Sequence, residues 1–128
     1  MTDLRHALPG GWLLESFVSR DDRSATVRYP FGEHPSGLIL YTDDGHMSAQ
    51  LTPGAGGEFV SYGGRFVVDE AAATVTHHVL IATMPELLAQ PQIRHARVDG
   101  DRLTLSATVT SHGSTTHSTL VWRRDAGL

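Results

Sequence analysis

The chain contains neither cysteine nor lysine among its 128 residues. Without cysteine, disulfides, thiol nucleophiles and cysteine-bound zinc are excluded. Without lysine, Schiff-base chemistry on a side-chain amine is excluded. The sequence also lacks an apolar run long enough to span a bilayer, and its N-terminal stretch MTDLRHALPGGW lacks the apolar core of a signal peptide. We therefore expect a cytoplasmic protein with no membrane partner.

A cluster of basic side chains is also missing. The formal net charge is −4, and the ten basic residues, all of them arginine, are spread along the chain. A nucleic-acid-binding domain normally presents a basic face to the phosphate backbone. We therefore expect no nucleic-acid partner.

The composition that is present is typical of one small globular domain. A chain of this length fits a single domain, residues 1–128, and can bury a core without disulfide or metal cross-links. Hydrophobic residues make up 40% and charged residues 19%, both ordinary values. The 13 glycines and 6 prolines suit many turns between short elements, which favours an all-β class.

Alternation of polar and apolar residues with period two dominates the sequence and predicts β-strands. Turn sequences DDG, DGD and SHG separate several of these segments and predict tight hairpins. We expect eight or nine strands in consecutive hairpins, closing into an up-and-down barrel because closure removes exposed edges. The expected strands are 11–19, a weaker 24–29, 37–42, 46–51, 58–69, 73–82, 92–98, 102–109 and 114–123.

Two local features interrupt the alternation. Within 83–91, Thr83 and Glu86 have the spacing of a capping box and Pro85 suits the first helical position, so we expect one short helical turn near 84–89. Gly63–Gly64 inside the strand 58–69 predicts a bulge or a close backbone approach. The glycine-rich loop 52–58 matches neither of the phosphate-binding glycine patterns.

Several segments together resemble the bacterial lipocalin-like domain family, in order, over about residues 10–124. The segments are GGWLLESF, GLILYTDDGHMSAQL, SYGGRFVVDEAAATVTHHVL, QIRHARVDGDRLTLS and LVWRR. The resemblance implies a small calycin-type barrel with a central cavity for an apolar or aromatic molecule. It also implies that a late arginine, Arg123 or Arg124, packs across Trp12 of the Gly-x-Trp sequence. Classical lipocalins are secreted and often carry a disulfide, and neither feature is present here.

The strand 73–82 places two adjacent histidines on opposite faces, because side chains alternate along a strand. One face carries Ala73, Val75, His77, Val79 and Ile81 and is apolar apart from the histidine, so we assign it to the interior. His77 is then inward and His78 outward, and the pair cannot chelate one metal ion. The other histidines have no spacing typical of a metal site. We expect no metal and no cofactor.

Arg94 is the predicted inward cation. It shares the more apolar face of 92–98 with Ala96 and Val98, and no acidic residue is an obvious inward partner. If it lies near His77, its charge lowers the histidine pKa and keeps the imidazole neutral. The two residues could then act as general base and oxyanion stabiliser, or they could be polar wall residues that orient a ligand or brace the barrel.

Other wall candidates follow from hairpin position or from side-chain adaptability. For three of them, Tyr41, Tyr62 and Gln50, the pattern leaves the face open. For Met47 and Met84 core packing is the alternative. On the first strand, alternation places Trp12, Leu14 and Val18 on one face, and we expect Trp12 and Trp122 to fill the closed end of the barrel.

Two functions fit these residues. The first is a barrel that binds a small hydrophobic molecule bearing a carbonyl or carboxylate group. The alternative is a cofactor-independent cyclase or isomerase of polyketide-like secondary metabolism that uses His77 and Arg94. An interaction module is less favoured because no sustained exposed apolar stripe is present, although a homodimer through a barrel wall is compatible with the sequence.

Overall fold

Nine β-strands form most of the chain in a computed structural model, which describes residues 3–24, 26–54 and 58–127. All neighbouring strands are antiparallel. The strands are β1 (Gly10–Asp21), β2 (Val27–Arg28), β3 (Ser36–Tyr41), β4 (His46–Thr52), β5 (Val60–Asp69), β6 (Thr74–Ala82), β7 (Gln92–Asp99), β8 (Arg102–Ser111) and β9 (Ser114–Asp125). Part of the glycine-rich loop 52–58, residues 55–57, lies outside the described residues.

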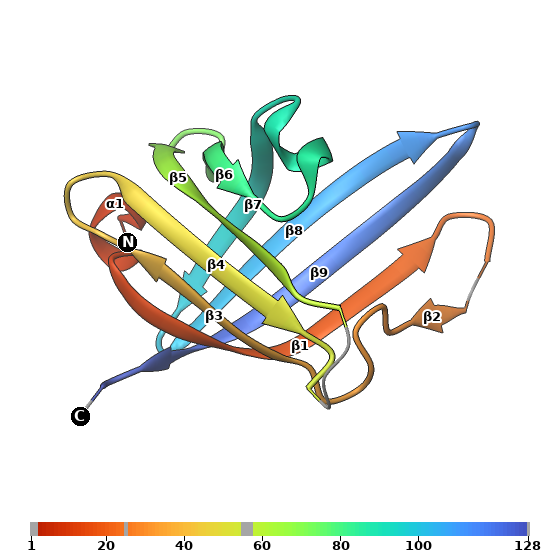
Figure 1. Ribbon diagram of the computed structural model, residues 1–128, viewed down its shortest axis with the longest axis horizontal. Helices are drawn as coiled ribbons and strands as arrows, with labels where there is room; N and C mark the ends of the chain where they lie inside the picture. Colours follow the sequence, from red (N-terminus) through yellow and green to blue (C-terminus); the bar gives the residue numbers. More distant parts are fainter. Residues whose placement is uncertain (1–2, 25, 55–57, 128) are drawn as a thin grey trace.

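Pairing of the first and last long strands closes the sheet into a barrel (Figure 1). The strand order is β2-β1-β3-β4-β5-β6-β7-β8-β9, and β1 pairs with β9 as well as with β3. Eight strands therefore form the barrel, while β2 is a two-residue addition at the end of β1. The predicted all-β, up-and-down barrel is confirmed.

A short helix covers one end of the barrel, which we call the closed end and which carries the turns at 42–45, 70–73 and 100–101. The helix is α1 (Leu4–Ala7), with Asp3 as its N-cap. Glu70 accepts hydrogen bonds from the backbone N–H groups of Leu4 and Arg5, and Leu4 and Leu8 are buried in the core. The sequence did not predict this helix because four residues are too few to show a helical period.

Trp12, Arg124 and Gly10 form the polar and aromatic seal of the closed end. The Arg124 guanidinium lies 4.1 Å above the Trp12 ring and donates to the carbonyl oxygen of Pro9. Trp12 Nε1 donates to Leu8 O at 2.9 Å. Gly10 has φ +125°, and a Cβ there would lie 2.8 Å from the guanidinium, so the glycine makes room for the arginine.

The opposite end of the barrel is open, because its strands separate there. The β7–β8 pairing stops at His95 and Ser106, and the β1–β3 pairing stops at Leu13 and Leu38. The β8–β9 hairpin continues well past this point and projects at the upper right of Figure 1. We call this the open end; the loops 29–35 and 83–91 lie at it too.

The helical turn of the segment 83–91 is a 3-10 helix, η1 (Pro85–Leu88), close to its predicted place at 84–89. The predicted capping box is wrong, since Met84 is the N-cap residue and makes no side-chain cap. Thr83 is instead tied to β5, because its Oγ1 accepts the N–H of Ser61 at 3.0 Å.

Two bulges change which residues face inward. The register of β5 and β6 shifts between Gly63 and Gly64, where Leu80 is the extra residue of β6. Ile81 was predicted to be inward and is instead outward and 72% exposed. A second shift, at Glu15 of β1, turns Val18 outward and Phe17 inward.

None of the helices in the described ranges is long and apolar enough to cross a membrane.

The close approach at the β5–β6 bulge predicts the cost of adding a methyl group there. A Cβ at Gly64 would overlap the carbonyl oxygen of His78 and lie 2.9 Å from Leu80 N. We expect Gly64→Ala to lower the free energy of unfolding by about 3 kcal/mol or more, since backbone atoms must move. Urea denaturation measures this value. The control is Gly63→Ala, whose Cβ would lie 3.2 Å from Met47 O; equal costs for the two variants would contradict the bulge geometry.

Candidate functional site

The exposure of inward-facing side chains rises from the closed end to the open end. On β8, Leu103 and Leu105 are buried, whereas Val109 on the same face is 60% exposed. On β7, Ala96 is buried and Arg94 is half-buried. The inward face is therefore more exposed toward the open end on these two strands, and Arg94 itself keeps part of its surface exposed.

His77 is the most deeply buried polar side chain of the interior, with 1% of its surface exposed. Its Nε2 lies 2.7 Å from the hydroxyl of Tyr41, and its Nδ1 lies 3.2 Å from the hydroxyl of Tyr62. Tyr41 reaches it from β3 and Tyr62 from β5. Both ring nitrogens are therefore in hydrogen bonds with tyrosines, so His77 has no free nitrogen to present to a bound molecule.

Burial keeps His77 neutral. It lowers the pKa of His77 from about 6.5 to about 3, and the positive charge of Arg94 adds to the effect. Burial likewise raises the pKa values of Tyr41 and Tyr62, while the Arg94 charge opposes both shifts. All three aromatic groups of the cluster are therefore uncharged at neutral pH.

Arg94 faces inward, as predicted. It pairs across the sheet with the buried Val75, next to the pair formed by His77 and Gln92. Its guanidinium donates to the side-chain oxygen of Gln92 at 3.2 Å and to the carbonyl oxygen of Ile93 at 2.9 Å. No carboxylate of the described ranges lies within ion-pair distance of it. Two neutral oxygens therefore accept hydrogen bonds from the guanidinium, and the side chain is partly exposed.

The structure brings some of the sequence-predicted wall residues to this cluster and not others. Tyr41 and Tyr62 both contact His77, and Met47 is buried in the core on the inward face of β4. Gln50 lies on the other face of β4 and donates to Ser48 Oγ at 2.8 Å, so it does not line the interior. Met84 is exposed at the start of η1.

Sequence reasoning missed Gln92 and Phe17. Gln92 accepts from Arg94 and is paired with His77 across the sheet. Its place on the Arg94 face of 92–98 was a signal that could have found it. Phe17 faces inward only because of the Glu15 bulge, which the pattern of residues does not show.

Trp122 adds a second buried donor to the interior. Its ring is 1% exposed, and its Nε1 finds no acceptor among the described residues. Trp12, in contrast, satisfies its indole N–H at Leu8. An unsatisfied buried N–H costs about 1–3 kcal/mol.

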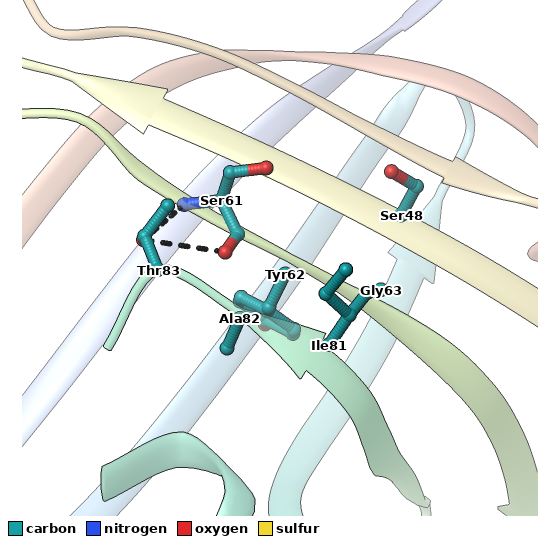
Figure 2. A pocket seen from close by; sticks show the side chains of 7 residues that line it. All are labelled: Ser48, Ser61, Tyr62, Gly63, Ile81, Ala82 and Thr83. Carbon is teal, nitrogen blue, oxygen red and sulfur yellow. Dashed lines mark hydrogen bonds between the residues drawn. The ribbon is translucent and has the colours of Figure 1, made fainter. Parts of the chain in front are cut away.

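A shallow groove crosses the outer face of β4, β5 and β6 (Figure 2). Most of the residues that line it occupy outward positions, so it is separate from the barrel interior. They are Ser48, Ser61, Tyr62, Gly63, Ile81, Ala82 and Thr83.

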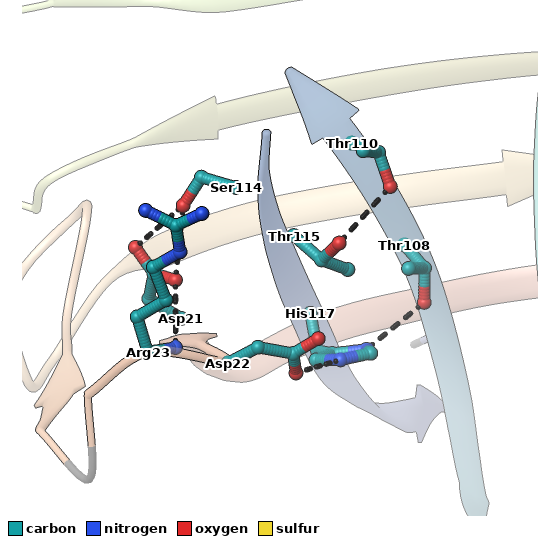
Figure 3. A network of polar contacts seen from close by, with 8 residues as sticks. All are labelled: Asp21, Asp22, Arg23, Thr108, Thr110, Ser114, Thr115 and His117. Atoms are coloured by element: carbon teal, nitrogen blue, oxygen red, sulfur yellow. Dashed lines mark hydrogen bonds and ion pairs between the residues drawn. The ribbon is translucent and has the colours of Figure 1, made fainter. Parts of the chain in front are cut away.

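A polar network joins the rim of the open end (Figure 3). Asp21 accepts a hydrogen bond from Ser114 at 3.1 Å. His117 lies 2.7 Å from the Asp22 carboxylate through Nε2 and 3.0 Å from the Thr108 hydroxyl through Nδ1. The network ties the end of β1 to the projecting β8–β9 hairpin.

Within the described parts of the chain, no group of three or more histidine, aspartate or glutamate side chains is placed to hold a metal ion. His77 and His78 point to opposite faces: His77 is buried, whereas His78 is exposed.

The family assignment agrees with this geometry. A sequence profile of the lipocalin-like domain family matches residues 9–56 and 54–125. The two matches cover nearly the whole chain, so the chain belongs to the lipocalin-like domain family. Its barrel is a fold that binds small molecules in its interior. No curated protein matches the chain.

The buried neutral histidine predicts a pH dependence of stability. The folded pKa of His77, about 3, lies below the value of about 6.5 in the unfolded chain. As pH falls below about 6, the unfolded chain binds a proton that the folded chain does not, so the free energy of unfolding decreases by about 1.4 kcal/mol per pH unit from this residue.

Urea denaturation of the wild-type protein and of His77→Gln between pH 7 and pH 4.5 measures this contribution. The wild type should lose stability more steeply than the variant on acidification. His78→Gln, which changes the exposed neighbour, should keep the wild-type slope. Parallel curves for the wild type and His77→Gln would contradict a neutral buried imidazole.

Proposed function

We propose that the barrel binds a hydrophobic molecule with a carbonyl or carboxylate group, which enters from the open end and places its polar group against Arg94. The observation that carries the proposal is an inward arginine with no carboxylate partner in the described residues. Arg94 is half-buried and donates only to neutral oxygens, so its charge and its remaining N–H groups are available. An oxygen of a bound molecule supplies a further acceptor.

Apolar inward side chains on β1 and β9 support a hydrophobic body for the ligand. Phe17 and Leu120 pair across β1 and β9 and are half-buried, and the Phe31 ring lies 5.5 Å from that of Phe17. A site with apolar walls and a few polar groups that fix orientation is the usual design of a small-molecule site.

A series of three naphthalenes of matched shape tests the proposal. 2-Naphthoate carries a carboxylate, 2-acetylnaphthalene a ketone and 2-ethylnaphthalene neither. We expect the wild type to bind 2-naphthoate most tightly in isothermal titration calorimetry. Arg94→Gln should weaken binding of 2-naphthoate by roughly 10-fold to 100-fold, because a hydrogen-bonded charge pair is lost, and should leave 2-ethylnaphthalene unchanged.

Arg97→Gln is the matched control, since Arg97 lies on the same strand with its side chain 79% exposed on the opposite face. It should bind all three compounds as the wild type does. Equal losses in the two arginine variants, or no binding of any compound, would contradict the proposal.

A second candidate is a cofactor-independent isomerase or cyclase that acts on carbonyl compounds of the polyketide kind. Tyr62 is hydrogen-bonded to His77, and the charge of Arg94 helps to lower the pKa of His77. A proton-exchanging hydroxyl and a positive charge in the same part of the interior favour this candidate. Removal of a proton from the carbon next to a carbonyl leaves an enolate, and the guanidinium would stabilise its oxygen. The Tyr62 hydroxyl would take this proton while its own proton passes to Nδ1 of His77, which requires the His77 tautomer that is protonated on Nε2.

Deuterium exchange separates the two candidates. An enzyme of this kind should exchange the methyl hydrogens of 2-acetylnaphthalene in deuterium oxide at least about 100-fold faster than its Tyr62→Phe variant, as measured by proton nuclear magnetic resonance. Exchange at the buffer rate would remove the second candidate and leave the binding barrel.

A further inference from the structure

We propose that Tyr41 holds His77 in the tautomer protonated on Nδ1, which leaves the hydroxyl hydrogen of Tyr62 free for a bound molecule. The site then offers a hydrogen-bond donor, and the group it recognises is an acceptor such as a ketone oxygen. The choice of ligand rests on the proposed function; the choice of tautomer does not.

The burial of Tyr41 carries the first step. Its side chain is 2% exposed, and the only partner of its hydroxyl in the described residues is His77 Nε2, at 2.7 Å. A hydroxyl has one hydrogen to donate. If Nε2 carried a proton, that hydroxyl hydrogen would have no acceptor in a place without solvent. Tyr41 is therefore the donor and Nε2 the acceptor.

The neutral imidazole carries the second step. A neutral ring has one protonated nitrogen, so an accepting Nε2 leaves the proton on Nδ1. Nδ1 lies 3.2 Å from the Tyr62 hydroxyl, and it therefore donates to the Tyr62 oxygen. The hydroxyl hydrogen of Tyr62 points elsewhere.

The free hydrogen of Tyr62 completes the chain of hydrogen bonds. His77 Nδ1 is the one hydrogen-bond partner of the Tyr62 hydroxyl in the described residues, so a hydroxyl that accepts from Nδ1 keeps its own hydrogen for an acceptor atom of a bound molecule. The order of donation runs from Tyr41 to His77, from His77 to Tyr62, and from Tyr62 to the ligand. His77 is thus a positioning residue, and Tyr62 is the residue that contacts the ligand.

Arg94 reinforces this direction. Its guanidinium is bonded to Gln92 and to the carbonyl oxygen of Ile93, so it gives the cluster positive charge without accepting a hydrogen bond. Both the tyrosine and the arginine then present donors toward the interior, and neither presents a base. In this tautomer, His77 cannot take a proton from Tyr62, so the cluster polarises a carbonyl rather than removing a proton beside it.

The tautomer can be measured directly in the ligand-free protein. Long-range proton–nitrogen correlation spectra of histidine labelled with nitrogen-15 distinguish protonated from unprotonated ring nitrogens, and His77→Gln identifies the signal. We expect Nδ1 to be protonated and Nε2 unprotonated at pH 7. Tyr41→Phe should shift the population toward the other tautomer, whereas Tyr29→Phe, in an exposed loop, should not. A His77 protonated on Nε2 in the wild type would overturn the proposed order of donation.

The ligand preference is measured with the matched ketone and hydrocarbon. Tyr62→Phe should weaken binding of 2-acetylnaphthalene by roughly 5-fold to 10-fold, the loss expected for one neutral hydrogen bond, and should leave 2-ethylnaphthalene unchanged. Tyr29→Phe is again the control, and thermal melting shows whether each variant is folded.

The tautomer spectra and the ligand affinities test different parts of the proposal. An unchanged ratio of ketone to hydrocarbon affinity in folded Tyr62→Phe would overturn Tyr62 as the ligand donor. If neither compound binds any variant, the ligand assignment is overturned together with the proposed function, while the spectra still decide the tautomer.

Discussion

Closure of the sheet by β1 and β9 is the constraint on which the rest of the structure depends. In a closed barrel, each side chain points either into the interior or out to solvent. An inward polar group must then find a partner inside the barrel or lie near the open end. The closure therefore determines which polar side chains face inward and need a hydrogen-bond partner there.

The inward polar groups of the described residues meet this requirement in different ways. At the closed end, Trp12 and Arg124 are satisfied by backbone carbonyls near α1, whereas Trp122 Nε1 has no acceptor. His77 is satisfied on both ring nitrogens by tyrosines. Arg94, whose cross-strand partner Val75 lies closer to the closed end than His77 does, has only neutral oxygens as acceptors. Arg94 is thus an inward charge with unused bonding capacity, which is why we place the site beside it.

Much of this arrangement could be predicted from the sequence, and the failures have local causes. Alternation and turn sequences sufficed for the barrel and for the inward places of His77 and Arg94, because both rest on a period of two. Ile81 and Val18 were assigned to the wrong face because one extra residue reverses the alternation beyond it. The Gly63–Gly64 pair marked the first bulge, but nothing marked the bulge at Glu15.

The contact between Tyr41 and His77 lay beyond sequence reasoning for a different reason. The residues are 36 positions apart on strands that do not pair, so their meeting depends on the curvature of the whole barrel. That contact changes the chemistry expected of the histidine. An inward neutral imidazole beside an arginine indicates a general base when considered alone. With both nitrogens hydrogen-bonded to tyrosines, the same imidazole sets the direction of the Tyr62 hydroxyl hydrogen. The group that can donate to a ligand is then the Tyr62 hydroxyl.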